Sequence, residues 1–348
     1  MRKRVWVLFA VLGVAAVGGA AFWYLREQRL TAYAATGFGS PEQKLILVPA
    51  GMAPRGIARL LADERVVSSA DLLYALIRRE ELGPKLKAGE YEFSGTLTPR
   101  EVIEKITTGQ VKQYPFTVPE GLRVDEILPI LASSGLELSL ATLKQLTANA
   151  AVARKLGVPA DSFEGFLYPD TYAFPRGANE EGVLKRMASS TVEQVKAARR
   201  KPGIELDLLQ AVTLASIIEK ETGAADERPT ISCVFHNRLK LKMKLQTDPT
   251  VIYAMLLLKG RYSKNITRAD LLTEHPYNTY MTEGLPPGPI ASPGGAAIAA
   301  ALNPIECDDL FFVSRNDGTH IFCPDLACHN AAVHQWQVQF HKRRKRAH

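Results

Sequence analysis

Hydrophobic positions change their spacing several times along the chain, and each spacing predicts a different kind of element. Residues 5–25 are uncharged and mostly apolar at 21 consecutive positions, which is long enough for a helix that crosses a bilayer. Residues 44–48 and 89–93 have strand patterns, and two helical patterns lie between them, at 54–63 and 69–81. An N-terminal helix followed by a strand-helix-helix-strand unit is therefore predicted.

The remainder of the chain is mainly helical in pattern. Helices are expected at 98–109, 140–158, 181–200, 229–240, 249–255 and 296–302. The pattern at 310–313 and 319–322, with Asp317-Gly318 between, predicts a β-hairpin. Residues 274–294 form a long loop with few regular elements, and loops of this length inside a domain are usually functional. The predicted fold class is α+β, with a mixed α/β domain after the N-terminal unit.

One predicted helix, 207–222, is apolar on almost every side as far as Ile218, which is typical of a helix buried in a core. Asp207 can cap its start and Gly223 can end it. At 100° per residue, Glu219 falls on the line of the packing residues, whereas Glu221 points roughly the opposite way.

The position of Glu219 has two interpretations. Partial burial and the negative end of the helix dipole both favour a protonated carboxyl, which a general acid requires. Alternatively, Glu219 marks a fraying helix end with ordinary exposed charge. From the helix alone, these two interpretations are equally well supported.

The net charge of +7 comes from the two ends of the chain. Three basic residues lie at 2–4 and five at 342–346, so the residues from 5 to 341 carry a net charge of −1. Binding to nucleic acid requires a basic surface and not only basic ends, so a nucleic-acid-binding body is disfavoured. The basic tail at 341–348 is interpreted as solvated.

The N-terminal residues predict how the chain is placed in a membrane. Basic residues 2–4 precede the apolar run and are expected to stay in the cytoplasm, so residues after 25 would lie outside it. A cleaved signal peptide is the alternative, but the run is longer than a signal core and ends in Phe22-Trp23-Tyr24-Leu25 instead of small residues. The predicted organisation is a cytoplasmic segment 1–4, a transmembrane helix 5–25, a tether 26–43, a module 44–113, a domain 114–340 and a tail 341–348.

Four cysteines fit one or two disulfides in an extracytoplasmic domain, at positions 233, 307, 323 and 328. Cys323 is expected to pair with Cys328 or with Cys307. A zinc site at His320, Cys323, Cys328 and His329 is the weaker alternative, because adjacent Cys-His ligands do not match structural zinc spacings.

Aromatic, hydroxyl and acidic residues gather in three further stretches, at 163–174, 245–250 and 277–280. Such groups suit sugar recognition, because sugar rings present apolar faces with hydroxyls at the rim. For 163–174, a turn packed on a core explains the composition at least as well.

Six stretches, in this order, are similar to those of the endolytic murein transglycosylases, the MltG or YceG-like family. They are EGFLYPDTY at 164–172, ASIIEKET at 215–222, VFHNRL at 234–239, LQTDPT at 245–250, YNTY at 277–280 and GLPPGPI at 284–290. The resemblance covers nearly the whole chain. It departs at Cys323 and Cys328, where relatives commonly carry other residues.

The resemblance implies a single-pass inner-membrane protein of the bacterial envelope, with a LysM-like βααβ module after the anchor and a periplasmic catalytic domain with a buried catalytic helix. The implied reaction is non-hydrolytic cleavage between N-acetylmuramic acid (MurNAc) and N-acetylglucosamine (GlcNAc) within a peptidoglycan strand, leaving a 1,6-anhydro end without a metal or other cofactor. The family's catalytic glutamate is assigned to Glu219. Peptidoglycan glycan strands are the expected partner, and the sequence leaves open which peptidoglycan synthases or division proteins the chain meets.

The residues expected to bind the glycan come from four of these stretches. They are Glu164, Tyr168, Asp170, Thr171, Tyr172, Glu221, Gln246, Thr247, Asp248, Tyr277, Asn278, Thr279 and Tyr280. Two alternatives remain. One is a muramidase that pairs Glu219 with Asp170, Asp248 or Glu164. The other is a non-catalytic wall-binding or division scaffold.

Overall fold

The computed structural model describes residues 2–260 and 265–339, without the side chains of 2–5 and 7–11. The chain divides into two compact units, residues 1–114 and 115–348. The predicted basic tail at 341–348 lies outside the described residues.

The N-terminal unit contains a two-stranded sheet covered by helices. Its elements are α1 (Arg2–Ala35), β1 (Lys44–Val48), α2 (Pro54–Asp63), α3 (Ala70–Arg79), the 3₁₀ turn η1 (Gly83–Lys85), β2 (Gly89–Phe93) and α4 (Pro99–Thr108). The strands are antiparallel, with Lys44 opposite Phe93 and Val48 opposite Gly89. Their inward side chains meet α2, α3 and α4 in one core. The predicted strand-helix-helix-strand order is confirmed.

The predicted tether at 26–43 is wrong in its first half. Helix α1 continues to Ala35, because Leu30, Tyr33 and Ala34 are buried in the N-terminal unit. Tyr33 also donates a hydrogen bond to the Ser69 carbonyl, at 2.9 Å. Within the described part of the chain, no helix is both long enough and apolar enough to span a membrane.

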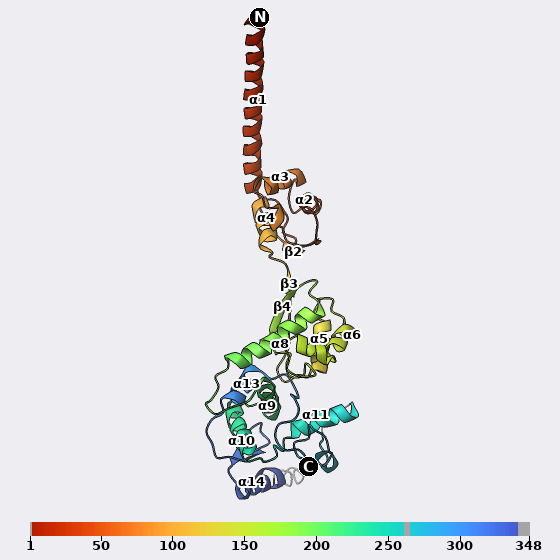
Figure 1. Ribbon diagram of the computed structural model, residues 1–348, viewed down its shortest axis with the longest axis vertical. Coiled ribbons are helices and arrows are strands. Elements are labelled where there is room, and N and C mark those ends of the chain that lie inside the picture. Colours follow the sequence, from red (N-terminus) through yellow and green to blue (C-terminus); the bar gives the residue numbers. More distant parts are fainter. Residues whose placement is uncertain (1, 261–264, 340–348) are drawn as a thin grey trace. The chain divides into compact units, whose positions relative to one another are not determined.

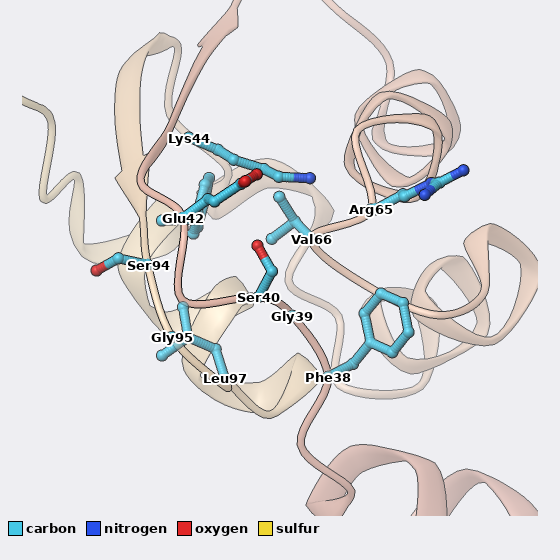
Figure 2. Close-up of a pocket in the computed structure, with 11 residues that line it drawn as sticks. Phe38, Gly39, Ser40, Glu42, Lys44, Arg65, Val66, Ser94, Gly95 and Leu97 are labelled. Atoms are coloured by element: carbon cyan, nitrogen blue, oxygen red, sulfur yellow. The ribbon is translucent and has the colours of Figure 1, made fainter.

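A hollow in the N-terminal unit lies between residues 38–44, 65–66 and 93–97 (Figure 2). Its volume of about 10 Å³ suffices for a single water at most. The buried hydroxyl of Ser40 at this hollow has no hydrogen-bond partner among the residues that the structure describes. A small-molecule ligand does not fit in this hollow.

The C-terminal unit is mostly helical. Its elements up to the central helix are β3 (Gln113–Thr117), α5 (Val124–Ala132), α6 (Leu140–Thr147), α7 (Ala150–Lys155), β4 (Thr171–Pro175), α8 (Glu180–Ala197) and α9 (Leu208–Glu221). After it come the 3₁₀ turn η2 (Ala225–Glu227), α10 (Arg228–Lys240), α11 (Asp248–Lys259), α12 (Arg268–Leu271), α13 (Gly295–Leu302), β5 (Phe311–Ser314), β6 (His320–Cys323), α14 (Leu326–Val333) and the π-helical turn η3 (His334–Gln339). Strands β3 and β4 pair with each other, as do β5 and β6 (Figure 1). Strand β4 is absent from the predicted elements, because the aromatic pattern at 163–174 is also typical of a packed turn.

Helix α9 is the centre of this unit. Every residue from Ala211 to Ile218 is buried, and the helix packs against α8, α10, α11 and α13 (Figure 1). Asp207 and Gln210 form the capping box at its start. The helix ends at an extended Thr222 and not at Gly223, so the predicted glycine cap is wrong.

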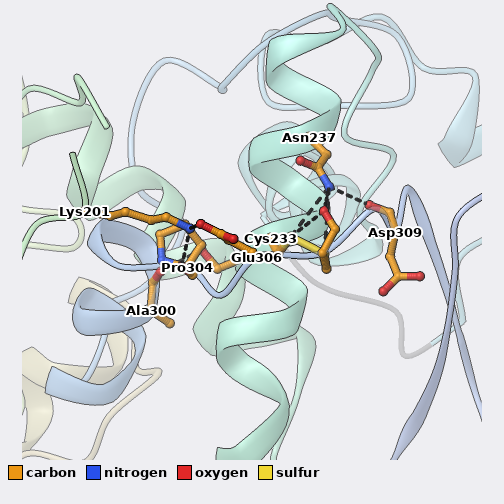
Figure 3. The surroundings of a disulfide bond; sticks show 9 residues. Lys201, Cys233, Asn237, Ala300, Pro304, Glu306 and Asp309 are labelled. Carbon is orange, nitrogen blue, oxygen red and sulfur yellow. Dashed lines mark hydrogen bonds and ion pairs between the residues drawn. A yellow bond between two sulfur atoms is a disulfide. The ribbon is translucent and has the colours of Figure 1, made fainter. Parts of the chain in front are cut away.

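Two disulfides cross-link the C-terminal unit. Cys323 at the end of β6 bonds Cys328 in the first turn of α14, which confirms one of the predicted pairings. Cys233 on α10 bonds Cys307, and Asn237 holds the same loop through the carbonyls of Cys307 and Asp309 (Figure 3). Because Cys323 and Cys328 bond each other, their thiolates are not free for the alternative zinc site.

Candidate active site

Glu221, the last residue of α9, lies on the wall of a cavity of about 630 Å³. Arg238, Gln246, Asp248 and Tyr280 also line it. The opposite wall comes from the C-terminal hairpin and the helix after it, through Phe311, Phe312, Val313, Ser314, His320, Leu326, His329, Val333 and Gln337. Residues distant in sequence thus surround the carboxyl group of Glu221.

The surroundings of Glu221 favour its protonated form. Burial raises the pKa of Glu221 to about 7, and the nearby charge of Asp248 acts in the same direction. A hydrogen bond from the Thr247 hydroxyl and the charge of Arg238 oppose this rise in pKa. A carboxyl with a pKa near neutrality can donate a proton and then take one back.

The backbone of the loop that carries Thr247 is held by hydrogen bonds to Thr279. Gln246 has a left-handed backbone, with φ of 48°, and its amide donates to the Thr279 carbonyl at 3.1 Å. The amide of Thr247 donates to the Thr279 hydroxyl, also at 3.1 Å. Asn278 is fully buried and donates to the carbonyls of residues 270, 271 and 273. Asn278 and Thr279 therefore support the loop and do not face the cavity.

Two further side chains of the cavity are fixed by their own partners. The Tyr280 hydroxyl donates to Asp248 at 2.7 Å. Arg238 donates to the carbonyls of Leu310 at 2.6 Å and Leu245 at 2.7 Å, and its guanidinium lies 5.1 Å from the Phe311 ring centre. Arg238 thus joins both walls of the cavity.

Glu219, the predicted general acid, does not line this cavity. One of its carboxylate oxygens accepts from Arg228 at 3.1 Å, and the other accepts from the Gly294 amide at 3.0 Å. The side chains of Glu219 and Arg228 are only 5% and 8% exposed, and Arg228 also bonds Glu120 at 3.4 Å. The structure therefore places Glu219 in an ion pair with Arg228 at the start of α10 and not in this cavity, a partner that the helix pattern did not reveal.

The predicted residues in EGFLYPDTY lie elsewhere in the unit. Glu164 is buried, where it accepts from the Val124 amide at the start of α5 and from the Tyr253 hydroxyl. Burial raises the pKa of Glu164 to about 7. Tyr172 packs on Phe116.

The others occupy several separate places. Asp170 accepts from the amide of the exposed Thr171, Tyr168 approaches Gly295, and Tyr277 packs on Tyr253. Four of the predicted residues line the cavity together: Glu221, Gln246, Asp248 and Tyr280. A fifth, Thr247, donates a hydrogen bond from its hydroxyl to the Glu221 carboxyl.

Sequence reasoning missed the wall formed by Phe311, Phe312, His320 and His329. The sequence pattern offers His320 and His329 only as ligands of the alternative zinc site. In the part of the chain that the structure describes, no group of three or more His, Cys, Asp and Glu side chains could hold a metal ion.

A desolvated carboxyl whose pKa is raised to about 7, in a cavity lined by hydroxyl, amide and aromatic groups, defines a site for acid–base chemistry. The chain belongs to the YceG-like family, whose model matches residues 46–335.

Relatives of known name are similar over most of the chain. The endolytic murein transglycosylase of Bacillus subtilis (strain 168) is 31% identical over 309 residues, which are 84% of each chain. The endolytic murein transglycosylase of Streptococcus pneumoniae (serotype 2, strain D39) is 26% identical over 77% of this chain and 53% of its own length. The chain therefore spans about half of the pneumococcal protein.

A solved structure is also similar. The crystal structure of a YceG-like protein from Listeria monocytogenes aligns with a TM-score of 0.53 and 28% identity. The alignment covers 84% of this chain and 99% of that one.

Proposed function

We propose that this chain is an endolytic lytic transglycosylase, which cleaves the bond between MurNAc and GlcNAc within peptidoglycan strands and leaves a 1,6-anhydro end. The observation that carries the proposal is the protonatable carboxyl of Glu221 on the wall of a cavity of about 630 Å³. The names of the bacillary and pneumococcal relatives support the reaction and the substrate.

In the proposed reaction, Glu221 and not Glu219 is the general acid. Protonated Glu221 donates to the glycosidic oxygen while the bond to C1 breaks, and charge develops on the sugar ring as in an oxocarbenium ion. The 6-hydroxyl of the muramic acid then attacks its own C1. Since the nucleophile belongs to the substrate, the reaction consumes no water.

Mass spectrometry of peptidoglycan digested by the protein tests this reaction. Anhydro ends are one water lighter than hydrolysed ends, and we expect anhydro ends to dominate. Hydrolysed ends alone would support a muramidase that uses Glu221 with Asp248, because both carboxyls line the cavity. No cleavage of intact strands would support the wall-binding scaffold.

We further propose that the N-terminal unit is a LysM-like module that binds glycan, and that residues 5–25 anchor the chain in the inner membrane with the catalytic unit in the periplasm. Apolar side chains exposed along α1 support the anchor, among them Trp6, Val14, Phe22 and Trp23. The LysM-like assignment is supported by the βααβ order of elements. Carbonate extraction of membranes and protease digestion of spheroplasts test the anchor. Release of the full chain by carbonate would contradict it.

A further inference from the structure

The imidazole of His320 is a second group able to move protons, and it lines the same cavity as Glu221. Glu227, at the end of η2, accepts from the backbone amide of His320 at 2.8 Å and lies 2.7 Å from its ring nitrogen Nδ1. The side chain of His320 is 11% exposed and that of Glu227 is 15% exposed. The carboxylate therefore holds the imidazole in one orientation.

The pairing fixes which nitrogen of His320 is available. A carboxylate only accepts hydrogen bonds, so in the neutral imidazole the proton is on Nδ1 and Nε2 is the acceptor. Among the residues that the structure describes, none donates a hydrogen bond to Nε2 of His320. The ring packs edge-on against Phe312, with the ring centres 5.4 Å apart, which limits its rotation.

His320 also lies where a substrate of Glu221 would lie. It extends from β6 and lines the cavity that Glu221 lines from α9. The other charged or titratable groups that line the cavity are Arg238, Asp248, Tyr280 and His329. Arg238 is committed to backbone carbonyls, and Asp248 and Tyr280 bond each other. His320 therefore combines a fixed orientation with a free acceptor nitrogen.

We propose that His320, oriented by Glu227, is a second catalytic residue: its Nε2 takes the proton of the muramic acid 6-hydroxyl as that oxygen closes on C1. A carboxylate, an imidazole and a hydroxyl in series form a general-base arrangement. This inference rests on the proposed lytic reaction. It divides the acid and base roles between Glu221 and His320.

The protons and electron pairs of this reaction balance. The proton of Glu221 moves to the glycosidic oxygen, which leaves C1 with the bonding pair and becomes the 4-hydroxyl of the released GlcNAc. A lone pair of O6 forms the new bond to C1, and the O6 proton moves to His320, whose imidazolium is stabilised by the Glu227 carboxylate. His320 then releases a proton to solvent while Glu221 takes one up.

The product ratio of His320 variants tests this role. Without the base, the 6-hydroxyl attacks C1 more slowly and water competes for the same carbon. We expect His320→Ala to release anhydro products at least about tenfold more slowly, with a larger hydrolysed fraction. Added imidazole, which the cavity can admit, should restore part of the rate and of the anhydro fraction. Glu227→Gln should shift the ratio in the same direction by a smaller amount.

Two further variants separate catalysis from folding. His320→Gln keeps an amide that can donate to Glu227, so it should stay folded and still show the larger hydrolysed fraction. His334→Ala, at an exposed position outside the cavity lining, should leave the product ratio unchanged.

Each negative result has a separate meaning. If folded His320 variants keep the wild-type ratio and imidazole has no effect, the role of His320 is overturned. If the wild-type protein forms no anhydro ends, the proposed lytic reaction itself fails.

Discussion

Glu219 and Glu221 are two positions apart on one helix, about 200° apart around its axis. Because α9 is apolar on nearly all sides, its own pattern cannot tell which carboxyl faces a cavity. The neighbouring elements decide. Arg228 and the Gly294 amide each donate a hydrogen bond to one carboxylate oxygen of Glu219. Glu221 instead accepts a hydrogen bond from Thr247 and lines the cavity.

Glutamine substitutions separate the two residues. Glu221→Gln removes the acidic proton, so we expect the release of anhydro products to fall at least about 100-fold while the protein stays folded. Glu219→Gln takes one of two carboxylate partners from buried Arg228, which keeps Glu120, and we expect a loss of about 1–3 kcal/mol in unfolding free energy with activity within about tenfold of wild type. Product release and urea unfolding measure the two effects. If folded Glu219→Gln were as inactive as Glu221→Gln, our assignment would be wrong.

The pKa of Glu221 predicts how activity depends on pH. A general acid acts in its protonated form, and this pKa is raised to about 7. We therefore expect kcat/KM to fall about tenfold per pH unit above pH 7. Since the charge of Asp248 helps to raise the pKa, Asp248→Asn should move the decline to lower pH. An unchanged profile in that variant would contradict the electrostatic account.

Glu164 makes a separate prediction about stability. Burial raises its pKa from 4.5 to about 7, so between these values the folded state binds more protons than the unfolded state. Its contribution to stability is present below pH 4.5 and is lost as pH rises towards 7, by about 1.4 kcal/mol per pH unit. Urea unfolding of Glu164→Gln across this range should show a shallower decline than wild type. Glu205→Gln, at an exposed position, should not differ from wild type.

At the scale of elements, the sequence predicts those helices, strands and turns that depend on residues close together in the chain. The cap at Asp207, the β1 and β2 patterns and the Asp317-Gly318 turn concern neighbouring residues, and the corresponding elements are present. Strand β4 and the cavity wall depend on partners far along the chain. The pairing of Glu219 with Arg228 joins the end of one helix to the start of another, which no single-helix pattern contains.

The two disulfides should differ in their effects when removed. Cys233–Cys307 spans 74 positions and Cys323–Cys328 spans 5. The chain-entropy model gives losses in unfolding free energy of about 4 and about 2 kcal/mol for the paired serine variants. Urea unfolding checks this order.

We expect the losses of cleavage activity in these two paired serine variants to follow the opposite order from their losses of stability. Ala332 is the one buried residue within α14, and the helix supplies Leu326, His329 and Val333 to the cavity wall. We therefore expect the Cys323→Ser, Cys328→Ser protein to lose more activity than the Cys233→Ser, Cys307→Ser protein. Equal losses would mean that α14 holds its place without the bond.

At the scale of the whole molecule, the family match at 46–335 includes parts of both compact units. The residues of each unit contact one another, and all residues that line the cavity with Glu221 belong to the second unit. Under the function proposed above, cleavage depends on residues 115–348, and the proposed binding to glycan and membrane depends on the residues before them. Comparing full-length protein with the second unit alone would measure that division.

The bond between Cys233 and Cys307 closes residues 233–307 into a covalent ring, and this ring carries the 245–250 loop, Tyr280 and Gly294. A protease that cuts the backbone once inside the ring leaves one molecule of unchanged mass apart from the added water. Such a nicked protein should migrate as a single band without reductant and as two bands with it. Cuts outside the ring, and outside the small loop at 323–328, should give two bands in either case.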